Sequence, residues 1–167
     1  GSLKDRIAIH MINEAEKGGQ IQSGDRLVEA TSGNTGISLA FVAALKGYKL
    51  TIVTHDKISQ EKVSQMKALG AEVVITGSHF TRKDAEYYQN IAKRLAEEKK
   101  AFYVSQFTNP NNPQAYEKTL APEIWQELDN RLDAVVCTVG SGGHLTGIAH
   151  FMQQVAPQVE IVLADPQ

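Results

Sequence analysis

The sequence predicts an α/β fold in which helices cover both faces of a parallel, twisted sheet. Short apolar runs of strand length alternate with longer segments whose apolar residues recur at helical spacing. Two-residue hairpin turns do not join the strand-like runs, so each strand is expected to return through a helix. The runs are continuously apolar, which indicates strands that lie between two helical layers.

The composition indicates a protein that folds around a substantial apolar core. The chain has 167 residues, of which 42% are hydrophobic and 22% charged, and its formal net charge is −2. Lys and Arg are dispersed among Asp and Glu, which argues against a nucleic-acid partner. Neither a bilayer-spanning apolar run nor a signal-peptide pattern is found, so a cytoplasmic protein without a membrane partner is expected.

The first half of the chain predicts three helices and three strands before residue 80. Ser2 or Asp5 is expected to cap the first helix, and Gly18 and Gly19 end it. The core-facing stripe of this helix comprises Ile7, Ala8, Met11, Ile12 and Ala15. The elements that follow are a strand at 27–30, a helix at 34–46, a strand at 50–53, a helix at 60–69 and a strand at 72–75.

The second half contains the predicted domain boundary. A helix is expected from Asp84 and a short strand at 102–104, followed by the clearest loop, Asn109 to Pro113. We therefore expect an N-terminal α/β domain at 1–109 and the start of a C-terminal α/β domain at 110–167. The latter predicts a helix at 116–128 that Pro122 kinks or restarts, a buried strand at 134–139 that contains Cys137, a helix at 144–154 and a strand at 161–164.

Two glycine-rich turns each follow a predicted strand and precede a predicted helix. They are Thr31 to Gly36 and Gly140 to Gly147. In an open α/β sheet, the carboxyl ends of strands and the free N–H groups of helix N-termini face the same crevice, so such turns suit a carboxylate or a phosphate. Taken alone, each turn is equally typical of ordinary helix capping. The second is also an imperfect dinucleotide-binding fingerprint.

A set of motifs occurs in a fixed order along the chain, at residues 1–6, 29–36, 67–72, 106–109, 112–113, 140–147 and 164–166. This set resembles the cysteine synthase and cystathionine β-synthase family of fold type II pyridoxal-phosphate enzymes. The resemblance covers the whole chain, is strongest to bacterial cystathionine β-synthase-like members, and implies the fold of the tryptophan synthase β subunit. Family members carry further segments on both sides, so we expect an internal fragment truncated at both ends.

The resemblance also implies roles for individual residues. Lys4 matches the lysine that binds pyridoxal 5′-phosphate as a Schiff base and removes the substrate's α-proton, and Asn34 matches the partner of the cofactor's ring hydroxyl oxygen. The phosphate cradle matches Gly140, Ser141, Gly142, Gly143 and His144, although the family usually has Thr in place of His144. The residues that match the substrate-binding group are Thr31, Ser32, Gly33, Thr35 and Gln106.

The implied activity is a β-replacement in cysteine biosynthesis, by a lyase or transferase that is a homodimer. Cystathionine formation from serine and homocysteine is favoured, and cysteine synthase, which joins O-acetylserine and sulfide, is the alternative. A catalytically incomplete scaffold is a further possibility. Spacing does not exclude a nucleotide-binding domain, because Asp165 lies near the position of a ribose ligand, but the set of motifs argues against it. The histidines show no metal-ligand spacing, so no metal is expected.

Overall fold

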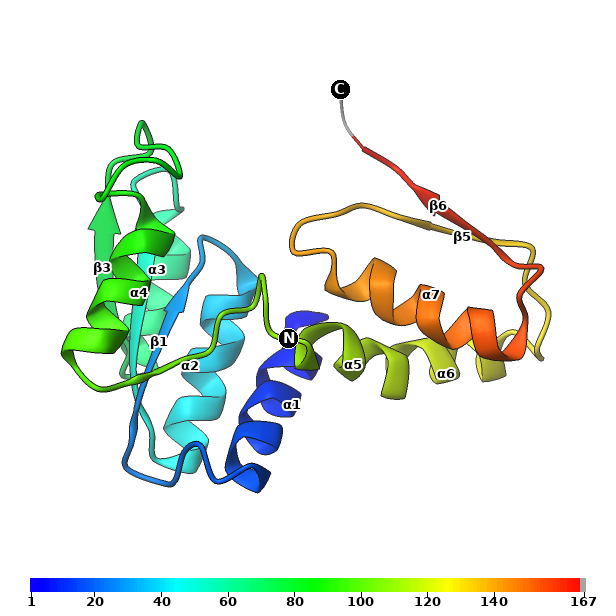
Figure 1. Cartoon of the computed structure of the whole chain (residues 1–167), viewed down its shortest axis with the longest axis horizontal. Coiled ribbons are helices and arrows are strands. Elements are labelled where there is room, and N and C mark those ends of the chain that lie inside the picture. Colours follow the sequence, from blue (N-terminus) through cyan, green and yellow to red (C-terminus); the bar gives the residue numbers. More distant parts are fainter. Residues whose placement is uncertain (166–167) are drawn as a thin grey trace. The chain divides into compact units, whose positions relative to one another are not determined.

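The chain folds into two compact units of the predicted α/β class. The computed structural model describes residues 1–165, so Pro166 of the 164–166 motif lies outside the described residues (Figure 1). The units comprise Gly1–Gln106 and Phe107–Gln167. Each contains a parallel sheet and helices, which confirms the predicted class.

Unit 1 is built on a four-stranded parallel sheet. Its elements, in chain order, are α1 (Lys4–Lys17), β1 (Arg26–Ala30), α2 (Asn34–Lys46), β2 (Lys49–His55), α3 (Gln60–Ala68), β3 (Glu72–Thr76), α4 (Tyr88–Glu98) and β4 (Phe102–Tyr103). The strand order is β3-β2-β1-β4, and every pair is parallel. The central strands β1 and β2 therefore have a neighbour on each side, which agrees with their continuous apolar sequences.

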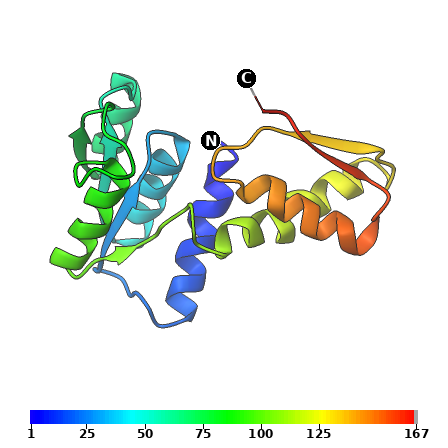
Figure 2. The same ribbon diagram turned by 45° about the horizontal axis from the view of Figure 1, so that its top comes forward.

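Helices cover both faces of this sheet (Figures 1 and 2). On one face, Val53 of β2 belongs to a buried cluster with Ala92 of α4. The preceding residue, Ile52, points to the opposite face, because successive side chains of a strand alternate. There it lies close to Gly36 of α2, where an added Cβ would also meet the sulfur of Met66 of α3. Because helices cover both faces of the sheet, neither Ile52 nor Val53 is exposed to solvent.

The start of α4 differs from the prediction. The helix begins at Tyr88 and not at Asp84. A carboxylate oxygen of Asp84 accepts hydrogen bonds from the backbone N–H and the hydroxyl of Thr81, at 2.7 and 2.8 Å. Asp84 therefore closes a turn that precedes the helix, a competing local structure that is common for aspartate.

Unit 2 consists of three helices and a two-stranded parallel sheet. Its elements are α5 (Asn111–Lys118), α6 (Leu120–Glu127), β5 (Ala134–Cys137), α7 (Gly143–Val155) and β6 (Glu160–Leu163). Cys137 is buried in the core of this unit, as predicted. Gly147 lets α7 approach α5 closely, because a Cβ at this position would collide with backbone atoms of Pro113 and Glu117.

The helix predicted at 116–128 is divided into α5 and α6, in agreement with the expected restart, but the division falls at Thr119 and not at Pro122. Helix α5 ends before Thr119, whose hydroxyl donates to the Ala115 carbonyl at 2.7 Å. Pro122 lies in the first turn of α6, where a helix needs no backbone donor. Pro113 occupies the same kind of position in α5, so the predicted loop at 109–113 is helical from Asn111 onward.

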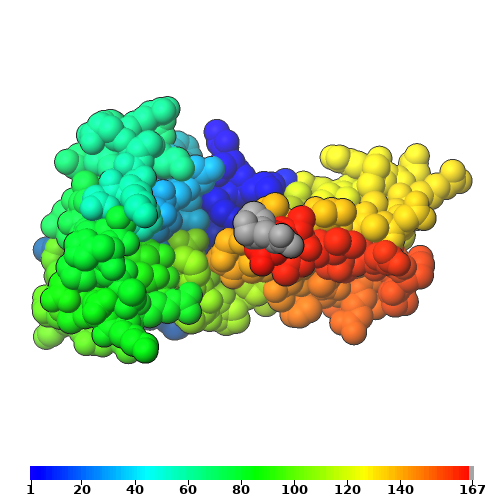
Figure 3. Space-filling model, turned by 90° about the horizontal axis from the view of Figure 1, so that it is seen from above, coloured from blue at the N-terminus to red at the C-terminus, as the bar shows by residue number. Residues whose placement is uncertain are grey.

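The strands of unit 2 are less buried than predicted. β5 ends at Cys137 instead of Val139, and the side chain of Val136 is 66% exposed. Its register partner on β6, Val162, is also exposed, and Figure 3 shows β6 in red at the molecular surface. One face of the β5–β6 sheet is therefore open to solvent, whereas the other carries the core packed against α7.

Candidate active site

Lys4 is the first residue of α1, at a helix start that local hydrogen bonds organise. Its backbone N–H donates to the Ser2 hydroxyl at 3.1 Å, and the Ser2 N–H donates to the Asp5 carboxylate at 2.8 Å. The Lys4 side chain is half-buried, and this burial lowers the pKa of its ammonium group. A lowered pKa raises the share of neutral amine, which is the form that attacks an aldehyde.

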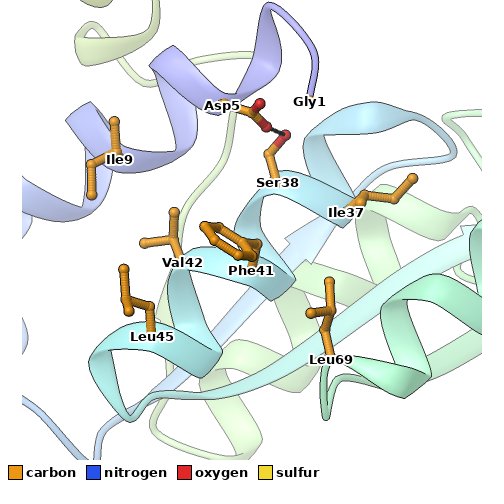
Figure 4. A pocket seen from close by; sticks show the side chains of 9 residues that line it. All are labelled: Gly1, Asp5, Ile9, Ile37, Ser38, Phe41, Val42, Leu45 and Leu69. Carbon is orange, nitrogen blue, oxygen red and sulfur yellow. Dashed lines mark hydrogen bonds between the residues drawn. The ribbon is translucent and has the colours of Figure 1, made fainter.

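A side-chain hydrogen bond attaches the start of α1 to α2. The Ser38 hydroxyl donates to the Asp5 carboxylate at 2.5 Å (Figure 4). A polar hollow of about 260 Å³ lies at this junction, and Ser2, Asp5 and Asn34 are among the residues that line it. The residues on either side of Lys4 thus border the same hollow as Asn34, the predicted partner of the cofactor ring.

The loop that connects β1 to α2 contains most of the predicted substrate-binding residues. Asn34 is exposed and Ser32 is partly exposed, whereas Thr31 and Thr35 are buried. The Thr31 hydroxyl accepts a hydrogen bond from the Gly33 N–H at 3.2 Å, which shapes the turn. The loop therefore combines accessible polar groups with an internally bonded frame.

Gln106 meets this loop from a distant part of the chain. Thr35 donates its hydroxyl hydrogen to Gln106 Oε1 at 2.8 Å, across 71 residues of sequence. The Gln106 amide nitrogen donates to the Ala30 carbonyl at 3.2 Å, and the Gln106 side chain is buried. Two predicted substrate-binding residues, Thr35 and Gln106, are thus in direct contact.

Glu29 belongs to the same network, although no role was predicted for it individually. It is fully buried at the end of β1, and its two carboxyl oxygens accept the backbone N–H groups of Ala30 and Gln106 at 2.7 and 3.0 Å. Burial raises the pKa of this carboxyl to about 8, against the opposite effect of the two hydrogen bonds. The signal in the sequence is an acidic residue within an apolar strand.

Unit 2 contains the second glycine-rich turn, between β5 and α7. Gly142 has a left-handed φ of 82°, and α7 begins at the next residue, Gly143. The N–H groups of the first helical turn have no partner within the helix, and the helix dipole makes this end positive. No atom lies within 4 Å of the Cβ position of Gly140 or Gly142, so a ligand can approach the backbone there. This geometry fits a phosphate group.

Asn112 supports this turn from α5. It is 1% exposed, and its side-chain amide nitrogen donates to the Ser141 hydroxyl at 3.0 Å. A Cβ on Gly143 would collide with the Asn112 side chain, so a larger residue there would force this buried amide to move. The His144 ring packs edge-on against Tyr116, with ring centroids 6.0 Å apart. Asn112 is part of a motif that carries the family resemblance, but it has no predicted role.

An apolar pocket of about 430 Å³ lies along α1 and α2 (Figure 4). Asp5 and Ser38 stand at one end of it, and the rest of its wall is mainly Ile9, Ile37, Phe41, Val42, Leu45 and Leu69. The predicted substrate-binding and cofactor-binding residues do not belong to this lining. The pocket adjoins the polar hollow beside Asn34, with which it shares Gly1, Asp5, Ile37 and Ser38.

Within residues 1–165, no three His, Cys, Asp or Glu side chains are grouped so that they could hold a metal ion. The same part of the chain has no helix with the length and apolar character needed to cross a membrane.

The family described as pyridoxal-phosphate dependent enzyme matches residues 1–167, and the chain belongs to it. The crystal structure of O-ureido-L-serine synthase superposes with a TM-score of 0.93 and 38% identity, covering 100% of this chain and 52% of that one. The predicted family and fold type are thereby confirmed.

Two curated relatives have different names at similar identity. Cystathionine beta-synthase from Dictyostelium discoideum is 44% identical over 167 residues, which cover 99% of this chain and 34% of that protein. Cysteine synthase B from Escherichia coli is 42% identical over 167 residues, which cover 100% of this chain and 54% of that protein. The chain therefore spans between about a third and a half of the length of these relatives.

Proposed function

We propose that this chain carries the Lys4 side of a pyridoxal-phosphate-dependent β-replacement site that acts on serine or O-acetylserine. A thiol or sulfide replaces the β-substituent, and cystathionine is the favoured product. The observation that carries the proposal is the Asp5–Ser38 hydrogen bond, because it attaches the helix start that bears Lys4 to the helix that begins at Asn34.

The residues of unit 1 have distinct tasks in this proposal. Lys4 binds the cofactor covalently, and its amine, once released, takes the α-proton from the amino acid. The lowered pKa of Lys4 keeps more of that amine unprotonated near neutral pH. Asn34 hydrogen-bonds the ring hydroxyl oxygen, and when bound the cofactor supplies a ring that withdraws electrons from the substrate's α-carbon.

The remaining predicted residues orient the two anionic groups. In unit 1, the amino-acid carboxylate is held by Thr31, Ser32, Gly33, Thr35 and Gln106. In unit 2, the cofactor phosphate is held by Gly140, Ser141, Gly142, Gly143 and His144. The open Cβ positions of Gly140 and Gly142 support the second assignment, since a phosphate oxygen needs close access to backbone N–H groups.

Cysteine synthase activity is the second candidate. Relatives of both names are similar to this chain at nearly equal identity, 44% for the cystathionine beta-synthase and 42% for the cysteine synthase B. In both cases the same residues would hold the amino acid. The two activities differ in the leaving group and the sulfur nucleophile, so product analysis separates them.

The first test is a visible absorption spectrum of the purified protein with added pyridoxal phosphate. We expect a band that disappears in Lys4→Ala and persists in Lys17→Ala, whose lysine is 72% exposed at the other end of the same helix. A folded wild-type protein without this band would contradict the proposal and favour a scaffold role. Incubation with serine and homocysteine, or with O-acetylserine and sulfide, followed by mass spectrometry, then identifies cystathionine or cysteine as the product.

A further inference from the structure

The backbone hydrogen-bond ladder between β1 and the segment after β4 stops just before Gln106. Val104 N–H donates to the Val28 carbonyl at 3.0 Å, as in a regular parallel ladder. In such a ladder the next donor, two residues further on, would be Gln106 N–H bound to the Ala30 carbonyl. Ser105 instead has a left-handed φ of 55°, which turns the chain out of the ladder.

Side chains take the place of the missing ladder bonds. The Gln106 N–H donates to Glu29 Oε2 at 3.0 Å, and the Ala30 carbonyl accepts from the Gln106 side-chain amide at 3.2 Å. The other oxygen of Glu29 accepts the Ala30 N–H at 2.7 Å. Both oxygens of this buried carboxyl are therefore used to satisfy backbone groups where the regular pairing ends.

This exchange of partners determines where the Gln106 side chain lies. Its amide nitrogen is directed to the Ala30 carbonyl, and its amide oxygen accepts the Thr35 hydroxyl at 2.8 Å. Glu29, Gln106 and Thr35 thus form one buried chain of contacts that joins β1, the segment after β4 and α2. A change in the position of the Gln106 backbone would move both its side chain and the hydrogen bond to Thr35.

We propose that Glu29 is a positioning residue for recognition of the substrate's α-carboxylate, because it holds the Gln106 backbone where the Gln106 amide contacts Thr35. This inference rests on the proposed function and deepens it, by naming a residue that acts on the amino acid only through Gln106 and Thr35. Burial raises the pKa of Glu29 to about 8, against the two N–H hydrogen bonds, which favour the charged form.

The test compares Glu29→Gln with a matched control, Glu72→Gln. Glu72 is a glutamate on β3 whose side chain is 58% exposed and bonds to Thr51 and Lys99. At position 29 the amide nitrogen of glutamine cannot accept an N–H hydrogen bond, so one backbone donor loses its partner. We measure the dissociation constant of pyridoxal phosphate from its absorption band, and then those of L-serine, O-acetylserine and L-serine methyl ester, which lacks the carboxylate.

In Glu29→Gln we expect a dissociation constant for L-serine and O-acetylserine raised about ten-fold, the effect of one lost buried hydrogen bond. Binding of the cofactor and of the methyl ester should stay within about two-fold of wild type, as should every constant in Glu72→Gln. General damage to the fold would instead weaken the ester and the acid equally. Equal affinity of wild type and Glu29→Gln for L-serine would overturn the inference and leave the proposed function intact.

A second measurement needs no variant. Amide hydrogen exchange of Gln106 in the wild-type protein should be slow, because its N–H is buried against Glu29. Rapid exchange at Gln106 would show that Glu29 does not hold this backbone, whatever the stability of the variants. A wild-type protein without the cofactor band would overturn the proposed function, and this inference with it.

Discussion

The Ser38 hydroxyl and the Asp5 carboxylate form a 2.5 Å hydrogen bond across 33 residues of sequence. Burial alone would raise the pKa of Asp5, but the hydrogen bonds from Ser38 and Ser2 lower it. Asp5 is therefore an anion at neutral pH, and the contact joins α1 to α2 next to Lys4.

Removal of this contact should destabilise unit 1. We expect Ser38→Ala to lower the free energy of unfolding by about 1 to 2 kcal/mol, the usual effect of a lost hydrogen bond to a charged group. Ser64→Ala, an exposed serine within α3, controls for the helix propensity of alanine. Urea unfolding of Ser38→Ala, Asp5→Ala and the double variant measures the coupling, and additive effects would contradict a direct interaction.

Lys4→Arg should separate the charge of Lys4 from its chemistry. Arginine stays protonated and cannot form the covalent link, so activity should fall by at least about 10³-fold. Thermal stability should change little, because the long side chain is only half-buried. Steady-state kinetics and a melting curve test both expectations, and retention of more than a tenth of the activity would exclude Lys4 as the catalytic lysine.

Gly143→Ala should destabilise unit 2, because the new Cβ collides with the Asn112 side chain. We expect a loss of about 2 to 3 kcal/mol, typical of overpacking. Gly140→Ala meets no atom within 4 Å and is the matched control for stability. The Asn112→Ala substitution added to Gly143→Ala should recover part of the loss, so denaturant unfolding that shows no recovery would rule out this collision as the cause.

The stability of the protein should decrease between about pH 5 and pH 9 through Glu29. Its pKa is about 8 in the folded chain against 4.5 in the unfolded reference, so in this window the folded state binds more protons. The stabilisation that Glu29 contributes is complete below pH 4.5 and is lost as the pH rises through about 8. The pKa values of Asp5, Glu16 and Glu72 are lowered, so these three carboxyls affect stability below this pH window.

Melting temperatures measured across this pH range in wild type and Glu29→Gln isolate the contribution of Glu29. The difference between the two proteins should shrink or change sign as the pH rises, because the variant has no proton to lose at position 29. A constant difference would show that Glu29 does not titrate with a raised pKa.

The order of strands and helices is readable from the sequence, because it depends on local patterns. The helix predicted at 34–46 has these bounds as α2, since an apolar helical stretch lies between the turn at Gly33 and the left-handed Gly47. Local competition explains the differences: Asp84 forms a turn with Thr81, and the helix expected to kink or restart at Pro122 is divided at Thr119.

The sequence by itself determined the α/β class, the family and the two glycine-rich turns, because periodicity and motif order depend on residues close together in the chain. Only the tertiary structure decided which side chains meet: Asp5 with Ser38, Asn112 with Ser141, and Glu29 with Gln106. The last pair is separated by 77 residues. This bond forms because the chain leaves the β ladder at Ser105. The buried Gln106 N–H then has no partner in the ladder and needs another acceptor.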